Sequence, residues 1–218
     1  MYPRPQLKRE SFFLLNGQWD FAFDDENIGV LEGWSHTVRG DRKINVPFTY
    51  ETGKSGIGDE RPHGVIWYWK NITITNEFKK DQSIQINFEG CDYHLDLWEN
   101  GVYKGSHDGA YTRFAFELGK FAEGEEVLLS IRVEDPHSEE QVRGKQRWLS
   151  DNYGCWYVQT TGIWKDVWLE QASDDYVEKI KITPGIYKKT VTIHTMCHSN
   201  KENLIMKSDV YFEGKFIN

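Results

Sequence analysis

Apolar and polar residues alternate along much of the chain, a pattern typical of β-strands that bury one face. The clearest run covers residues 126–134, where Val127, Leu129, Ile131 and Val133 fall on one face. Similar alternation predicts further strands, over residues 17–23, 43–46, 66–75, 83–89, 93–99, 102–104 and 113–117.

Turn and loop signals separate these runs. Asn100-Gly101 is the strongest hairpin signal, because both central positions of a type I′ turn need a positive φ. Residues 105–109 predict a turn and residues 118–123 a single turn of helix, whereas residues 1–16 show little periodicity. The glycine-rich stretch 48–65 predicts a long loop, which is either a solvated excursion or part of a functional site.

Strands that recur about every ten residues, without a helical period of useful length, predict an all-β sandwich. They argue against a doubly wound α/β fold. The pattern changes after Glu170, where a polar linker precedes three predicted strands over residues 176–182, 190–196 and 204–212. We therefore predict a sandwich domain over residues 1–172. Residues 173–218 are too few for an immunoglobulin-type domain of about 100 residues, so they predict a truncated second sandwich.

Composition narrows the classes of partner. The net charge of −8, without a long basic run, argues against a nucleic-acid partner. No apolar run approaches the roughly 20 residues of a membrane span, and no secretory signal opens the chain, so we predict a cytoplasmic protein without a membrane partner. Three scattered cysteines fit a reducing compartment.

Clusters of histidine, aspartate and cysteine raise the question of a metal. The spacing of these residues does not fit a structural zinc site, and no cysteine pair supports one. We therefore predict neither a metal nor a cofactor from the two clusters, which comprise Asp92, His94, Asp96 and His107, and His194, Cys197 and His198.

The segment 141–170 carries the candidate chemistry. It opens on a cationic loop, in which Arg143, Lys145 and Gln146 can donate hydrogen bonds to sugar hydroxyls or to a carboxylate. Trp148 and Trp156 can stack on the apolar face of a pyranose ring. The alternative role of these side chains is packing within the core or between domains.

The last part of this segment predicts a single strand. Over residues 161–170, Ile163, Val167 and Leu169 share one face, and Trp164 and Trp168 share the other. For these two tryptophans in a regular strand we expect a packing role.

Several motifs, in order and spacing, resemble the N-terminal sugar-binding domain of family 2 glycoside hydrolases, the β-galactosidase and β-glucuronidase group. The resemblance spans roughly residues 10–172. Each motif alone is weak, and the ordered combination carries the resemblance; the motifs are Leu15-Asn-Gly-Gln-Trp-Asp-Phe21, Val46-Pro47 with Tyr50-Glu51, Gly64-Val-Ile-Trp-Tyr68, Phe88-Glu-Gly-Cys-Asp-Tyr93, Leu97-Trp-Glu-Asn-Gly101, Gly105-Ser-His107, Tyr111-Thr-Arg-Phe-Ala-Phe116, Arg143-Gly-Lys-Gln146, Thr161-Gly-Ile-Trp164 and Val167-Trp-Leu-Glu170.

The resemblance implies a jelly-roll β-sandwich, then an immunoglobulin-like sandwich, then a catalytic TIM barrel. The barrel of such a retaining O-glycoside hydrolase holds two glutamates about 5 Å apart, one the acid and the other the nucleophile. The resemblance places this barrel beyond residue 218, so it implies no catalytic residue in this chain and no hydrolysis by the chain alone. It is compatible with a homo-oligomeric parent protein.

The resemblance also implies that residues 51–65 and 143–157 lie at the rim of the parent's active site. Relatives place a sugar-binding aspartate where Trp156 stands here, so we do not transfer that contact, and Asp151 is the nearest substitute. Two other functions stay open, a stand-alone carbohydrate-binding module or lectin and a purely structural docking domain. The predicted carbohydrate-binding residues are Arg143, Lys145, Gln146, Trp148, Asp151, Trp156 and Tyr157.

Overall fold

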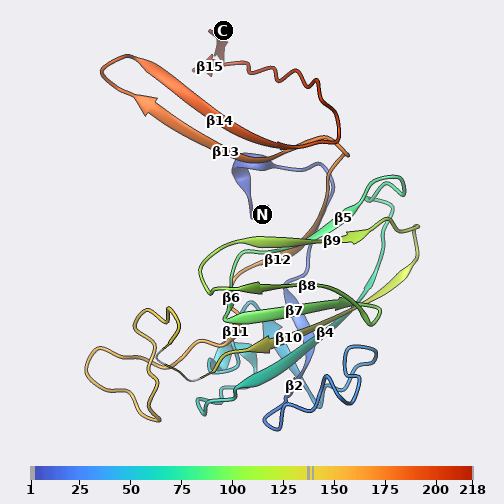
Figure 1. The fold of residues 1–218 in the computed structure, drawn as a ribbon, viewed down its shortest axis with the longest axis vertical. Helices are drawn as coiled ribbons and strands as arrows, with labels where there is room; N and C mark the ends of the chain where they lie inside the picture. Colours follow the sequence, from blue (N-terminus) through green and yellow to red (C-terminus); the bar gives the residue numbers. More distant parts are fainter. Residues whose placement is uncertain (1–2, 137, 139, 218) are drawn as a thin grey trace. The chain divides into compact units, whose positions relative to one another are not determined.

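The computed structural model describes residues 3–136, 138 and 140–217 of the chain. It consists of two compact units, Met1–Ala172 and Ser173–Asn218. The first unit is a β-sandwich of two antiparallel sheets (Figure 1). The four-stranded sheet has the order β1 (Phe12–Leu14), β12 (Val167–Gln171), β5 (Ile84–Phe88), β9 (Phe114–Gly119). The six-stranded sheet has the order β3 (Arg42–Val46), β2 (Gly17–Phe23), β4 (Val65–Thr73), β10 (Glu126–Glu134), β7 (His94–Glu99), β8 (Val102–Asp108).

The hydrophobic core lies between the two sheets and confirms the alternation expected for β10. Val127, Leu129, Ile131 and Val133 are fully buried there, together with inward side chains from the facing sheet. Each such side chain contributes on the order of 1.5–3 kcal/mol through removal of apolar surface from water. The all-β class expected from strand spacing is therefore confirmed.

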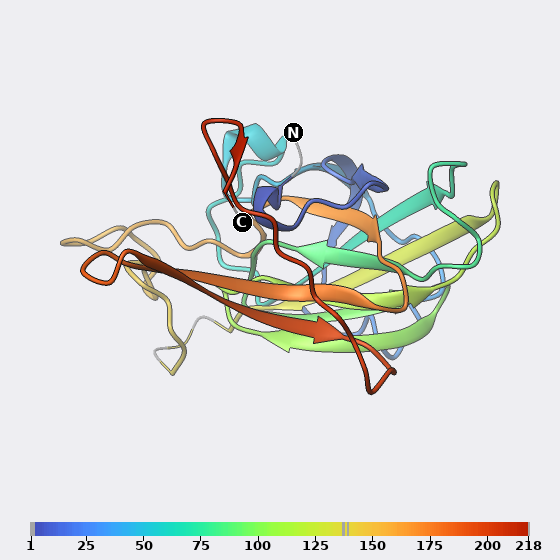
Figure 2. The same cartoon turned by 90° about the horizontal axis from the view of Figure 1, so that it is seen from above.

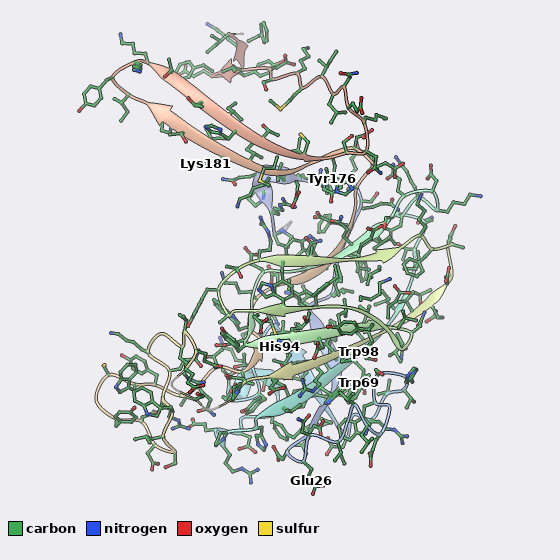
Figure 3. All side chains as sticks on the ribbon, in the orientation of Figure 1. Glu26, Trp69, His94, Trp98, Tyr176 and Lys181 are labelled. Atoms are coloured by element: carbon green, nitrogen blue, oxygen red, sulfur yellow. The ribbon has the colours of Figure 1, made fainter. Side chains whose placement is uncertain are left out.

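Part of the six-stranded sheet is buried on its outer face as well. The loop 24–41 crosses this face, and the Trp34 ring packs against Trp67 and Trp69 of β4. Trp69 Nε1 donates a hydrogen bond to the Trp34 carbonyl oxygen at 2.8 Å, and Trp67 Nε1 donates to Asp24 at 2.9 Å. Trp98 of β7 stacks on Trp67 of β4, so these indole rings meet over the intervening strand β10. Trp69 and Trp98 are labelled in Figure 3.

The β7–β8 hairpin confirms one turn and corrects another. Asn100 and Gly101 have φ values of 49° and 79°, as a type I′ turn requires. The turn expected over residues 105–109 is wrong, because β8 continues to Asp108. A register shift opposite Leu97 and Trp98 accommodates Gly105, whose φ of 146° allows a β-bulge in place of a chain reversal. The helical turn expected over residues 118–123 is also wrong, because β9 extends to Gly119.

Three other segments differ from expectation. The arm 1–16 contains β1, which pairs with β12, and the 3-10 helix η1 (Pro5–Leu7). The loop 48–65 contains a second 3-10 helix, η2 (Gly53–Ser55). The single strand expected over residues 161–170 is interrupted, because β11 (Gly162–Ile163) pairs with β6 (Cys91–Asp92), whereas β12 joins the four-stranded sheet. Within the described ranges, no helix has the length and apolar character to span a bilayer.

The second unit is a long antiparallel hairpin of β13 (Tyr176–Gly185) and β14 (Thr190–His198), followed by the short pair β15 (Tyr211–Phe212) and β16 (Lys215–Phe216). The strand expected over residues 204–212 is wrong except at its last two residues. Large apolar side chains of the hairpin remain exposed, including Ile182 and Val191. That this unit begins an immunoglobulin-like sandwich stays a prediction.

Candidate functional site

The short pair of β6 and β11 holds the centre of the candidate site. Gly162 lies opposite Asp92 in this pair and has a φ of 92°. A Cβ at Gly162 would lie 2.1 Å from the Tyr68 hydroxyl oxygen, which accepts a hydrogen bond from the Ile163 amide at 3.3 Å. This position therefore requires glycine, and its close packing brings the carboxyl group of Asp92 under the loop that follows β10.

Gln146 ties this loop to the sandwich. Its buried side-chain amide donates to Asp92 Oδ2 at 2.6 Å, and its carbonyl oxygen accepts from the Thr160 amide at 2.6 Å. The flanking backbone adds two bonds with Tyr157, from the Tyr157 amide to the Lys145 carbonyl at 2.9 Å and from the Arg147 amide to the Tyr157 carbonyl at 2.7 Å. The two ends of the loop are thus pinned to each other.

Arg143 is buried at the base of the same loop. Its Nη1 atom donates to Asp135 Oδ1 at 3.3 Å and to the Pro136 carbonyl oxygen at 3.0 Å. Asp135, at the end of β10, also accepts a hydrogen bond from the Thr161 hydroxyl at 2.8 Å. The Arg143 guanidinium therefore faces the buried Asp135 carboxylate, which the Thr161 hydroxyl also holds in place.

Arg147 joins the second candidate loop to the first. Its guanidinium donates to Gln159 at 3.1 Å, to Asn152 at 3.0 Å and to the Glu60 carbonyl oxygen at 2.8 Å. The Gln159 amide donates to the same Glu60 oxygen at 3.0 Å. The loops 48–65 and 143–157, which the sequence singles out separately, therefore share one hydrogen-bond network.

The aromatic residues of the loop form their own cluster. Trp148 contacts Trp156 edge to face with ring centroids 4.8 Å apart, and Tyr153 packs edge-on against Trp148 at 5.6 Å. Tyr157 is 61% exposed. In Figures 1 and 2 the gold segment between β10 and β11 projects beyond one end of the sandwich.

Two concave surfaces lie on this segment. The first, which we call the Tyr111 hollow, has a volume of about 250 Å³ and is lined by Asp92, Tyr111, Arg143, Lys145, Gln146, Tyr157, Val158, Thr160 and Trp164. The second, the Trp148 hollow, has a volume of about 190 Å³ and is lined by Gln141, Arg143, Gly144, Gln146, Trp148 and Trp156. Arg143 and Gln146 line both hollows.

Two buried carboxyl groups near these hollows have raised pKa values. Burial raises the pKa of Asp92 to about 7, and the neighbouring charge of Asp135 acts in the same direction. Burial also raises the pKa of Glu51, in the 48–65 loop, to about 7, and the nearby hydroxyls of Thr49 and Thr161 offset only part of that effect. In the described part of the chain, neither Glu51 oxygen has a partner in hydrogen-bonding geometry.

The structure distributes the expected sugar-binding residues over the two hollows. Arg143, Lys145, Gln146 and Tyr157 line the Tyr111 hollow, whereas Trp148 and Trp156 line the Trp148 hollow. Asp151 is among the lining residues of neither hollow, and its exposed carboxylate accepts a hydrogen bond from Ser150 at 3.0 Å.

Five wall residues of the Tyr111 hollow were not predicted from the sequence as sugar-binding residues, namely Asp92, Tyr111, Val158, Thr160 and Trp164. Trp164 is half-buried, and its Nε1 atom donates to the Ala110 carbonyl at 2.9 Å while its ring meets Tyr111 edge-on at 6.0 Å. Long-range pairing of β6 with β11 creates these contacts. The signal available in the sequence was that Asp92 and Gly162 each lie within a recognised motif. Among the described residues, no group of three His, Cys, Asp or Glu side chains is placed to hold a metal ion.

Concave surfaces lined by aromatic rings and a few polar groups are typical of small-ligand binding sites. Residues 12–173 match the model of the glycosyl hydrolases family 2 sugar binding domain, and the chain belongs to this family. A β-galactosidase of Thermoanaerobacterium thermosulfurigenes is 25% identical over 87% of this chain and 25% of its own length. A β-glucuronidase of Formosa agariphila is 25% identical over 73% of this chain and 16% of its own length.

Solved structures show the same fold. The apo structure of the Ruminococcus gnavus β-glucuronidase superposes with a TM-score of 0.70 at 18% identity, covering 92% of this chain and 35% of that one. A β-glucuronidase from an uncultured Clostridium species gives a TM-score of 0.67 at 21% identity, covering 93% of this chain and 36% of that one. The chain thus spans only a minor part of the length of these relatives.

Proposed function

We propose that this chain is the N-terminal carbohydrate-binding portion of a retaining O-glycoside hydrolase, in which the loops 48–65 and 143–157 form part of the rim of an active site. The observation that carries the proposal is the convergence of Asp92, Arg143 and Gln146 with the rings of Tyr111 and Trp164 at one hollow. Sugar hydroxyls both donate and accept hydrogen bonds, and the apolar face of a pyranose packs on aromatic rings. The Tyr111 hollow offers both kinds of contact.

The exposed apolar side chains of the loop support a contact with a catalytic barrel. Val142 is 71% exposed and Leu149 is 53% exposed. Exposed apolar clusters with polar borders are typical of surfaces that contact another domain. We propose that the barrel of the parent protein covers them and that it supplies the two catalytic glutamates.

The proposal is tested by comparing the isolated chain with its full-length parent. The isolated 218-residue chain should not hydrolyse chromogenic β-galactosides or β-glucuronides, whereas the parent should. In the parent, Trp156→Ala should lower kcat/KM roughly 10- to 100-fold through lost positioning of the sugar, since one displaced contact at a rim costs about that much. Trp19→Phe, in the sandwich core and outside the lining of both hollows, is the matched aromatic control and should leave kcat/KM close to the wild-type value after correction for folded fraction.

Two results would reject the proposal. Turnover by the isolated chain would show that the barrel is not needed. A parent in which Trp156→Ala and Gln146→Met leave kcat/KM unchanged would show that the loop plays no part in substrate recognition. Micromolar binding of a neutral monosaccharide by the isolated chain, together with a parent that has no glycosidase activity, would instead indicate a stand-alone binding module.

A further inference from the structure

Three ionisable side chains are buried in and next to the wall of the Tyr111 hollow, and their charges do not balance. Asp92 and Arg143 line the hollow, and Asp135 forms an ion pair with Arg143 at 3.3 Å. The three residues are 2%, 6% and 4% exposed, respectively. Within this group, one carboxyl is left without a buried counter-ion. Because an unpaired buried charge is costly, such a carboxyl group takes up a proton.

The hydrogen bonds show which of the two carboxyl groups this is. Asp135 accepts hydrogen bonds from three side chains, those of Gln141, Arg143 and Thr161. In the described part of the chain, Asp92 accepts only one, from the Gln146 amide at 2.6 Å. Hydrogen bonds and an adjacent cation favour the ionised form, so Asp135 holds the charge and Asp92 the proton. In agreement, burial raises the pKa of Asp92 to about 7, and the charge of Asp135 acts in the same direction.

The contacts of Asp92 also locate its proton. The Gln146 carbonyl oxygen accepts from the Thr160 amide at 2.6 Å, so the amide nitrogen of Gln146 is the donor to Asp92 Oδ2. The carbonyl oxygen of a neutral carboxyl group is its better acceptor, which leaves the proton on Oδ1. Among the described residues, Oδ1 makes no hydrogen bond, yet it is not one of the partnerless polar atoms that are sealed from solvent. Since Asp92 lines the Tyr111 hollow, its Oδ1–H group is a donor available there.

The other ionisable groups around Asp92 do not take the place of this proton. Lys145 is exposed, so water screens its charge. Burial raises the pKa of the Cys91 thiol well above its usual value, so this neighbour on β6 adds no charge. The surrounding ionisable side chains come from β4, β6, β10, the segment after β8 and the loop 143–157, and they are Tyr68, Cys91, Asp135, Tyr111, Arg143, Lys145 and Tyr157.

We propose that Asp92 binds the ligand of the Tyr111 hollow in its protonated form, with Oδ1–H as the donor to a ligand oxygen, so that filling the hollow is coupled to proton uptake above neutral pH. A ring, hydroxyl or glycosidic oxygen of a sugar can accept this bond. A ligand also displaces water from Oδ1, which disfavours the carboxylate further. The inference rests on the proposed carbohydrate-binding function, and it gives Asp92 no part in bond cleavage.

The test counts the protons that accompany binding. Methyl β-galactoside and methyl β-glucoside, which carry no ionisable group at these pH values, are titrated calorimetrically into the 218-residue chain in two buffers of different ionisation enthalpy. The difference between the two binding enthalpies gives the number of protons taken up. Because the pKa of Asp92 is about 7 in the free chain, we expect uptake of about 0.9 proton per ligand at pH 8 and about 0.1 at pH 6. The Kd should be about tenfold higher at pH 8 than at pH 6, because only the protonated fraction binds.

Asp92→Asn is the variant that isolates the proton. Its side-chain carbonyl can accept from Gln146, and its N–H group replaces Oδ1–H as a permanent donor. Proton uptake should vanish, and the Kd should no longer rise between pH 6 and pH 8. Glu51→Gln is the matched control, because burial also raises the pKa of Glu51 to about 7 but Glu51 is not among the lining residues of the hollow. This variant should retain both the uptake and the rise in Kd.

Infrared spectroscopy of the wild-type chain gives the answer even if Asp92→Asn does not fold. At pH 6 a carboxylic-acid C=O band should shift when either glycoside is added, because the Oδ1–H group gains an acceptor. A spectrum without a shifted band, under conditions where calorimetry shows binding, would overturn the proposal.

The calorimetric outcomes distinguish this inference from the function on which it rests. Binding without proton uptake, or with proton release, would overturn the protonated site and leave carbohydrate binding intact. Uptake that persists in Asp92→Asn, or that disappears in Glu51→Gln, would assign the proton to another group and would also overturn it. Binding of neither glycoside at pH 6 would overturn both this inference and carbohydrate binding by the isolated chain.

Discussion

Replacing Glu51 by glutamine changes one buried charge and almost nothing in shape. The Glu51 residue is 6% exposed, and in the described part of the chain its carboxylate oxygens have no hydrogen-bond partner. Burial raises its pKa from 4.5 to about 7. At about 1.4 kcal/mol for each pKa unit, this shift corresponds to roughly 3 kcal/mol of destabilisation once the group is ionised in the folded state.

The sign of the pH dependence follows from proton linkage. Between pH 4.5 and 7 the folded chain holds the Glu51 proton and the unfolded chain has released it. Stability contributed by this group is therefore fully present below pH 4.5, falls as the pH rises through 7, and then stays low. Because glutamine cannot ionise, Glu51→Gln should match the wild type near pH 4.5 and exceed its stability by up to about 3 kcal/mol at pH 8.

Chemical denaturation followed by tryptophan fluorescence measures this difference in the sandwich, the structural unit that contains Glu51. All nine tryptophans lie in the sandwich, between Trp19 and Trp168, so the signal reports the unfolding of that unit alone. Asp92 titrates in both proteins, so subtracting the wild-type free energy of unfolding from that of Glu51→Gln at each pH removes its contribution. Glu123→Gln, at an exposed glutamate, is the control and should leave the profile unchanged. A Glu51→Gln profile that runs parallel to the wild type from pH 4.5 to 8 would refute the reasoning.

Three further substitutions test the packing of the site. Gln146→Met should lower the free energy of unfolding by about 2–4 kcal/mol in urea titrations, because it leaves the Asp92 carboxyl and the Thr160 amide without their partner; a loss below 0.5 kcal/mol would contradict the bridging role. Gly162→Ala should lower the free energy of unfolding by more than about 3 kcal/mol, since the new Cβ meets the Tyr68 hydroxyl at 2.1 Å and the φ of this residue is positive. Gly53→Ala, which adds a Cβ in open space, is the control and should change the stability little. Thermal unfolding measures both variants. Arg147→Met should increase the rate of limited proteolysis in both loops together, because one guanidinium joins them; cleavage confined to one loop would show that they open independently.

Local alternation was enough to predict the strands whose two faces differ. Strand β10 and the Asn100-Gly101 hairpin follow directly from period-two patterning and turn chemistry. The end of β8 could not be predicted in the same way, because Gly105 has two structural meanings. In the sequence it signals a turn, and only the pairing with β7 makes it a bulge within a strand.

In the candidate site, too, residues with a local sequence signal were predictable and residues placed by long-range contacts were not. The loop residues Arg143 and Gln146 were predicted because cationic and amide side chains stand beside tryptophans in the sequence. Asp92 and Tyr111 could not be assigned, since Asp92 reaches the hollow through pairing with Gly162, some 70 residues away, and Tyr111 through its long-range ring contact with Trp164. Nor could Glu51 be predicted as a buried charge, because a glutamate within a glycine-rich loop is usually solvated.

The pairing of β6 with β11 also buries a cysteine that directly precedes Asp92, a wall residue of the Tyr111 hollow. Cys91 is fully buried opposite Ile163, and burial raises the pKa of its thiol well above the usual value. Cys155 and Cys197 are exposed. A thiol reagent should therefore modify Cys155 and Cys197 rapidly. It should modify Cys91 only when β6 separates from β11, because a buried neutral thiol does not react. The rate of the Cys91 modification reports how readily the core opens at β6 in the native protein, without any engineered label.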